Sequence, residues 1–148
     1  MKKPFDILVV GELNVDLILN GIEKFPEIGK EVLARGMTLT LGSSSAIFAS
    51  NISRLGARVV FLGKIGEDKF GEIVTSSLIS SGVDISMVRC DSDAMTGATI
   101  ILNVEEDRAN TTYAGAMELL TAEDIRDEDL DQARHLHFSS YFLQPGMW

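Results

Sequence analysis

The chain has 148 residues, 45% of them hydrophobic, which suits a globular protein with one sizeable core. Its net charge of −9 argues against nucleic acid and against an anionic membrane as main partners. Cys90 is the single cysteine, so neither an internal disulfide nor a cysteine-based zinc site can form. Asp6, Glu12 and Asn14 interrupt any hydrophobic N-terminal region, and no apolar run is long enough to span a membrane, so we expect a soluble, cytoplasmic protein.

The first part of the chain alternates between predicted strands and helices. Apolar or β-rich runs predict strands and apolar residues at helical spacing predict helices, in the chain order 7–10, 44–55, 58–62, 70–79 and 83–89. Gly56 and Gly82 stand where the two helices should end. Alternation of this kind predicts a right-handed, parallel α/β layer.

Three further segments do not fit this alternation and read as extra strands, at about 14–20, 32–41 and 96–113. The last of them has the pattern of a hairpin, with a polar tip at residues 105–108. We expect these segments to form a second, smaller antiparallel sheet. Such a sheet needs cover on an apolar face, from a ligand, from the main domain or from another subunit.

The rest of the chain predicts a surface helix and one more strand. Thr121 opens a segment whose charges, over residues 119–133, indicate a solvated helix or turn. Residues 135–142 return to strand character. His135 and His137 share a face of this strand, and without a nearby carboxylate they are expected to be packed or surface residues rather than metal ligands.

Two polar residues follow the first predicted strand, at the edge where open α/β sheets bind ligands. Asn14 and Asp16 place an amide beside a carboxylate. Together they can donate to and accept from vicinal hydroxyls, which is what a sugar presents. The same pair also suits a plain turn in which both side chains bond nearby backbone N–H groups, and spacing alone leaves both interpretations open.

A glycine-serine turn begins the first predicted helix, at Gly42, Ser43, Ser44 and Ser45. The first N–H groups of a helix have no intrahelical partner, so this turn can hold a polar ligand. Serine is also a common helix cap, and both roles use the same donors.

A second glycine pattern, G-x-x-G-x-D-x-x-G, runs from Gly63 through Gly66 and Asp68 to Gly71. It predicts a glycine-type turn before the second helix, with Asp68 as a helix cap or a ligand. It lacks the terminal Gly-Lys-Ser/Thr of a P-loop. Gly11 is likewise not followed by the G-x-G-x-x-G spacing of a nucleotide-binding oxidoreductase, which argues against that class.

The run over residues 41–71 resembles the first signature of the PfkB-type carbohydrate kinases, the ribokinase-like sugar and nucleoside kinases. Four residues of this run stand at positions that match the signature, namely Gly56, Gly66, Asp68 and Gly71. The resemblance implies a ribokinase-like parallel sheet flanked by helices, incomplete in this chain, with the small antiparallel sheet as a β lid. It also implies transfer of the γ-phosphate of ATP to a hydroxymethyl group of a sugar-like substrate.

The resemblance assigns substrate contacts as well. Asn14 and Asp16 match the family's sugar-hydroxyl site, and Ala98 belongs to a T-G-x-A turn that touches substrate in relatives. Tyr141 ends the last predicted strand on the ligand-binding edge. The candidate substrate-binding residues are therefore Asn14, Asp16, Gly42, Ser43, Ser44, Ala98 and Tyr141. No catalytic residue and no metal ligand is expected in this chain.

The chain departs from the family at two turns. The family has a Gly-Gly pair and a following Asn where this chain has Leu41-Gly42 and Ile47. Met117 replaces the Asn of a family Gly-Ala-Asn turn. The serines beside Gly42 could supply the missing polar contacts, so these departures bear on the identity of the substrate more than on the fold.

No Gly-Ala-Gly-Asp-like segment occurs in these residues. In the family that segment supplies the base and an anion hole, and it lies with the ATP site in the C-terminal half. The resemblance thus implies that ATP and Mg²⁺ bind in a half that residues 1–148 do not include. We expect these residues alone to bind ATP poorly, to show no turnover, and to be marginally stable or self-associated.

Two functions therefore stay open. The first is the substrate-binding half and lid of an ATP-dependent sugar kinase, forming a homodimer through the β lid. The alternative is a non-catalytic sugar-binding or dimerising module. Because the basic residues Arg35, Lys64, Arg89 and Arg108 are scattered, the expected substrate is an unphosphorylated sugar, sugar acid or nucleoside.

Overall fold

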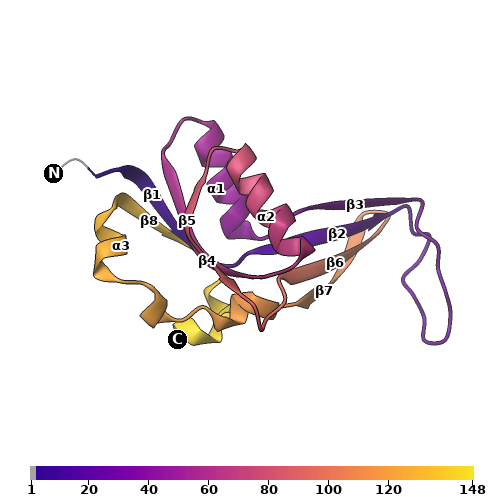
Figure 1. Cartoon of the computed structure of the whole chain (residues 1–148). Helices are drawn as coiled ribbons and strands as arrows, with labels where there is room; N and C mark the ends of the chain where they lie inside the picture. The colour runs from indigo at the N-terminus through magenta and orange to yellow at the C-terminus, as the bar shows by residue number, and fades with distance from the viewer. Residues whose placement is uncertain (1–2) are drawn as a thin grey trace.

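The computed structural model describes residues 3–148, which form two sheets (Figure 1). The main sheet carries both long helices, and the lid sheet projects from it as an arm. No helix within residues 3–148 combines the length and the apolar character needed to cross a membrane.

The main sheet is wholly parallel, in the strand order β5-β4-β1-β8. Its strands are β1 (Phe5–Val10), β4 (Val59–Gly66), β5 (Asp84–Asp91) and β8 (Ala133–Phe138). Helix α1 (Ser44–Arg54) precedes β4, and α2 (Lys69–Ser80) connects β4 to β5. The parallel α/β layer predicted from the sequence is confirmed, and all four strands end at one edge.

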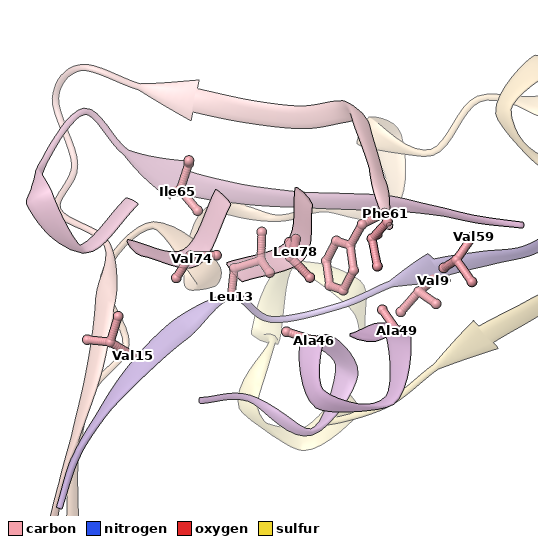
Figure 2. Packing of buried hydrophobic residues seen from close by; sticks show 11 residues of the cluster. Val9, Leu13, Val15, Ala46, Ala49, Val59, Phe61, Ile65, Val74 and Leu78 are labelled. Atoms are coloured by element: carbon pink, nitrogen blue, oxygen red, sulfur yellow. The ribbon is translucent and has the colours of Figure 1, made fainter. Parts of the chain in front are cut away.

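Both helices pack on one face of the main sheet, over a buried cluster of apolar residues (Figure 2). Val9 of β1 and Phe61 of β4 point to this face and pack with Ala49 of α1 and Leu78 of α2. On each strand, the residues next to Val9 and Phe61 in the sequence point to the opposite face, because side chains alternate along a strand. The main sheet is therefore buried on both faces, as its continuous apolar runs predict.

Short turns cover the opposite face. There Leu8, Val10 and Leu62 pack against Leu120 and Ala133. The covering elements are η1 (Gly115–Leu119), η2 (Ala122–Asp124), α3 (Asp127–Asp131), η3 (Tyr141–Leu143) and η4 (Pro145–Met147).

The segment 119–133, predicted as a solvated helix or turn, forms two separate short helices. Asp124 accepts the backbone N–H of Thr121 at 2.8 Å, and Asp129 accepts that of Arg126 at 3.1 Å. Each carboxylate thus caps the start of its own short helix, so the chain begins η2 and then α3 instead of one helix. The strand predicted over 135–142 ends at Phe138.

The lid sheet has the order β3-β2-β6-β7. Its strands are β2 (Asn14–Asn20), β3 (Gly36–Leu41), β6 (Gly97–Val104) and β7 (Asp107–Tyr113). The prediction of an antiparallel lid is wrong in one pairing: β2–β3 and β6–β7 are antiparallel, but β2 and β6 run parallel, so the lid sheet is mixed. The reason is that β2 and β6 follow β1 and β5, which end at the same edge, and both strands leave that edge in the same direction.

The lid sheet has one polar and one apolar face. The strand register places Asp16 beside Thr40 of β3 and Thr99 of β6 on the polar face. The apolar face continues outward from Val15, which belongs to the core cluster. Its residues beyond Val15 include Leu17, Met37, Leu39, Ile100 and Tyr113.

The second glycine pattern forms the joint between the main sheet and the lid sheet. Gly63 and Gly66 lie within β4 and Gly71 within α2, and none has a positive φ, so the predicted glycine-type turn is wrong. A Cβ at Gly66 would strike the carbonyl oxygen of Ala94 and would lie 2.7 Å from the nitrogen of Thr96. Glycine is required here by the close approach of two backbones.

Asp68 ties this joint together as the N-cap of α2. Its Oδ1 accepts the N–H of Gly71 at 2.8 Å, and its Oδ2 accepts the N–H of Thr96, just before β6, at 2.7 Å. Thr96 Oγ1 in turn accepts the N–H of Gly66 at 2.9 Å. Burial acts to raise the pKa of Asp68, but the bonds from the Gly71 and Thr96 N–H groups outweigh it and leave this pKa below its usual value.

Replacing Asp68 by alanine should lower the free energy of unfolding by about 2 kcal/mol, because it removes a helix cap and leaves the buried Thr96 N–H without an acceptor. Glu67→Ala is the matched control, since Glu67 is exposed, and should change this free energy by less than about 0.5 kcal/mol. Urea unfolding measures both variants. Equal stabilities would contradict the role given to Asp68.

Candidate functional site

Gly42 lies between two polar side chains at the base of the lid sheet. Asn14 and Asp16 are two residues apart on β2 and therefore share a face. A Cβ at residue 42 would lie 2.7 Å from Cγ of Asp16 and 2.8 Å from Oδ1 of Asn14. The absent side chain of Gly42 leaves the space that both polar groups face, so the structure brings together these three predicted site residues.

Asn14 is held by a chain of hydroxyl groups on the lid sheet. Its Nδ2 donates to Thr99 Oγ1 at 2.7 Å, and Thr99 Oγ1 lies 3.0 Å from Thr112 Oγ1 on β7. Asn14 is only 4% exposed, and its Oδ1 has no hydrogen-bond partner within residues 3–148. A buried acceptor left in this state costs free energy unless a bound molecule donates to it.

Asp16 is the second acceptor at this place. It is half-buried, and burial raises the pKa of its carboxyl above the usual value. Beside the free oxygen of Asn14, the ionised carboxylate can accept from two neighbouring hydroxyl groups. The arrangement suits a hydroxyl-rich ligand and disfavours an anionic group at this position.

The serines that begin α1 are occupied within the protein. Ser43 is the N-cap of α1. Its Oγ accepts the N–H of Ala46 at 3.2 Å and donates to the carbonyl oxygen of Glu12. The backbone N–H and Oγ of Ser44 both donate to Oε1 of Glu12, at 2.9 and 2.8 Å. A ligand that used these donors would have to compete with Glu12.

A positive φ of 69° falls at Ser43, directly after Gly42. Glycine adopts such a backbone more readily than serine does, so the surroundings must hold Ser43 in this conformation.

Sequence reasoning missed Glu12, which is 4% exposed and lies two residues after the end of β1. Besides Ser44, its carboxylate accepts from Ser45 Oγ at 2.6 Å, Ser140 Oγ at 2.6 Å and Gln144 Nε2 at 3.4 Å. Burial acts to raise the pKa of Glu12, but the bonds from Ser140, Ser45 and Ser44 outweigh it and leave this pKa below its usual value. No local pattern marks Glu12, because its donors come from two distant parts of the chain, residues 44–45 and 140–144.

The remaining two candidates lie apart from this group. Ala98 pairs with Val15, and its side chain packs against the core cluster, on the face opposite to Asp16. Tyr141 lies in η3, where its ring meets that of Phe138 edge-on with 6.0 Å between centroids. Their roles as substrate contacts stay predictions.

The residues described here do not fit ATP or Mg²⁺. Lys64 and Arg89 both donate to Asp124, Lys64 at 2.8 Å, so their charges are already paired. Across residues 3–148, no three His, Cys, Asp or Glu side chains are placed to hold a metal ion.

A parallel α/β layer with a projecting lid sheet is the architecture of the ribokinase-like fold. Residues 5–148 match the model of the pfkB family carbohydrate kinases, and the chain belongs to this family. The family and the fold expected from the resemblance are thereby confirmed.

Individual relatives are kinases of several sugars. The chain is 29% identical over 146 residues to 5-dehydro-2-deoxygluconokinase of Clostridium tetani, covering 96% of this chain and 42% of the relative. It is 35% identical over 105 residues to fructokinase-1 of Zea mays, covering 69% and 32%. The structure of ribokinase from Cryptococcus neoformans var. grubii serotype A in complex with ADP is similar with a TM-score of 0.79 and 25% identity, over 95% of this chain and 43% of that one. The chain thus spans less than half the length of these proteins.

Proposed function

We propose that this chain is the substrate-binding part of an ATP-dependent sugar kinase that phosphorylates a hydroxymethyl group of a sugar-like substrate. The observation that carries the proposal is the pair of acceptors on either side of Gly42, the free Oδ1 of Asn14 and the carboxylate of Asp16. Membership of the carbohydrate kinase family supports the phosphoryl transfer. The names of the relatives cover several sugars. Because the basic residues Arg35, Lys64, Arg89 and Arg108 are scattered, the proposed substrate class stays an unphosphorylated sugar, sugar acid or nucleoside.

In this proposal the described residues bind and orient the substrate. Asp16 and Asn14 accept from its hydroxyl groups, and Gly42 leaves room for the ring. The lid sheet covers the bound sugar and excludes water, which keeps the phosphoryl group from being lost to hydrolysis. ATP, bound with Mg²⁺ by residues outside those described, supplies the phosphoryl group.

Sugar-dependent ADP release by the protein expressed from its complete reading frame tests this function. We expect release with at least one member of a panel of sugars, sugar acids and nucleosides, and none from residues 1–148 alone. Binding of a sugar in calorimetry without ADP release from the complete protein would instead support a non-catalytic sugar-binding or dimerising module.

We also propose that the apolar face of the lid sheet pairs with the lid of a second copy. Met37 is 69% exposed, Tyr113 is 55% and Ile100 is 42%, and exposed apolar patches of this kind mark interaction surfaces. Sedimentation of the complete protein at micromolar concentration should show a dimer that Met37→Glu converts to a monomer. A monomeric wild-type profile would contradict this pairing.

A further inference from the structure

Glu12 and two serine turns form a closed polar cluster at the carboxyl edge of the main sheet. Glu12 follows β1 within two residues, Ser43 caps α1, and Ser140 lies in the turn that follows β8. Within residues 3–148, Glu12 forms no salt bridge, and its carboxylate accepts only from serine and glutamine groups. Burying a carboxylate without a cation costs free energy, so the cluster calls for an explanation beyond packing.

Two serines of this cluster have backbone conformations that favour glycine. The φ angles are 69° at Ser43 and 57° at Ser140. Such conformations cost free energy in a residue with a side chain, and they persist where the surroundings impose them. The other non-glycine residue with positive φ in the described chain, Glu105, lies in the tight turn between β6 and β7, and that turn accounts for it.

Glu12 supplies a cause at both serines. Ser43 Oγ donates to the backbone oxygen of Glu12, and the next N–H, that of Ser44, donates to Glu12 Oε1 at 2.9 Å. The peptide after Ser43 is therefore turned toward the carboxylate. Ser140 Oγ donates to the same Oε1 at 2.6 Å. One carboxylate oxygen thus joins the turn that follows Gly42 to the segment that leaves β8.

We propose that Glu12 is a positioning residue of the substrate site, whose carboxylate holds the turn after Gly42 and the turn at Ser140 in one shared conformation. This inference rests on the proposed function. Glu12 does not bind the substrate itself, because neighbouring serines and Gln144 already donate to both of its oxygens. It acts by fixing the backbone at Gly42, and so the space across which Asp16 and Asn14 meet a sugar.

The matched pair Ser140→Ala and Ser140→Gly separates the hydrogen bond from the backbone conformation. Both variants lose the bond to Glu12, but only glycine adopts a φ of about +57° without strain. In the complete protein we expect Ser140→Ala to raise KM for the sugar about fivefold and Ser140→Gly to change it by less than about twofold, with KM for ATP unchanged in both. Equal KM values for the sugar in the two variants would overturn the proposal.

Glu12→Gln completes a double-mutant cycle. Its amide N–H₂ meets groups that are themselves donors, so we expect KM for the sugar to rise about tenfold. Adding Ser140→Gly should recover at least about threefold of that loss, because glycine no longer needs Glu12 to hold its backbone. Strictly additive effects would show that Glu12 does not act through Ser140. If Glu12→Gln fails to fold, the alanine and glycine variants of Ser140 still decide.

The cycle also separates this inference from the proposed kinase function. Absence of ADP release from the wild-type protein on every sugar would count against the kinase, not against the role of Glu12. The same variants would then be compared by their thermal unfolding midpoints, where Ser140→Gly should restore part of the loss caused by Glu12→Gln. If Ser140→Gly restores none of the unfolding midpoint lost in Glu12→Gln, that result alone would overturn the positioning role.

Discussion

Asparagine in place of Asp16 is expected to lower kcat/KM for the sugar by about 100-fold in the complete protein. The substitution keeps the shape of the side chain but removes the charge and places an N–H₂ where a sugar hydroxyl must donate. The free energy of unfolding should stay within about 0.5 kcal/mol of wild type. The Asp16 carboxylate forms no ion pair with residues 3–148, so the substitution breaks none. Steady-state kinetics and urea unfolding measure the two effects separately.

The pH dependence of the same variant gives a second test. Burial raises the pKa of Asp16, so a larger fraction of this carboxyl is protonated at mildly acid pH than of an exposed one. KM for the sugar should therefore rise as the pH falls through this raised pKa, and Asp16→Asn should remove that dependence. Asp107→Asn, on the exposed start of β7, is the control and should leave kcat/KM for the sugar and the pH dependence of KM unchanged. Wild-type kcat/KM in Asp16→Asn would contradict the assignment.

Alanine at position 42 is expected to raise KM for the sugar by about 100-fold while leaving the fold nearly intact. The added Cβ would lie 2.8 Å from Asn14 Oδ1 and would overlap the Asp16 carboxylate, so both acceptors must move away from their present positions. The cost to stability should be below about 1 kcal/mol, because φ at Gly42 is not positive and the displaced atoms are ends of side chains.

Gly36→Ala is a control at the start of β3, the strand that ends next to Gly42. A Cβ there would meet only Asn20 Cβ, at 3.9 Å, which is an ordinary contact. The two glycine variants should differ in KM for the sugar, measured by steady-state kinetics. Their thermal unfolding midpoints should agree within about 4 °C. A Gly42→Ala protein that binds sugar as well as Gly36→Ala does would show that the space beside Asp16 is not the binding site.

Local patterns were sufficient for the main sheet and its helices. The apolar run of β1 and the spacing of apolar residues in α1 and α2 each lie within one element, and burial selects for them directly. The sequence also predicted Asp16, Asn14 and Gly42 as site residues, from their positions after strands and from the family resemblance, and the structure brings them close together. Ser43 was expected at the start of a helix, and it caps α1.

The predictions that failed concern relations between elements. The charges over 119–133 indicated a solvated helix or turn, but they did not show that Asp124 and Asp129 would each cap a separate short helix. The glycines at 66 and 71 were expected to serve a turn. Instead, Gly66 makes room for the backbone around Thr96, and Gly71 makes room for the carbonyl oxygen of Gly66 and the Thr96 hydroxyl.

Tertiary structure alone decided the mixed pairing of the lid sheet and the cluster around Glu12. The direction of β6 beside β2 depends on the edge from which both strands leave the main sheet, which no pattern within either strand records. Glu12 and Ser140 are 128 residues apart, and their hydrogen bond exists only because β1 and β8 are neighbours in the main sheet. Hydrogen bonds between distant residues have no periodicity in the sequence, whereas burial of a strand or a helix face does.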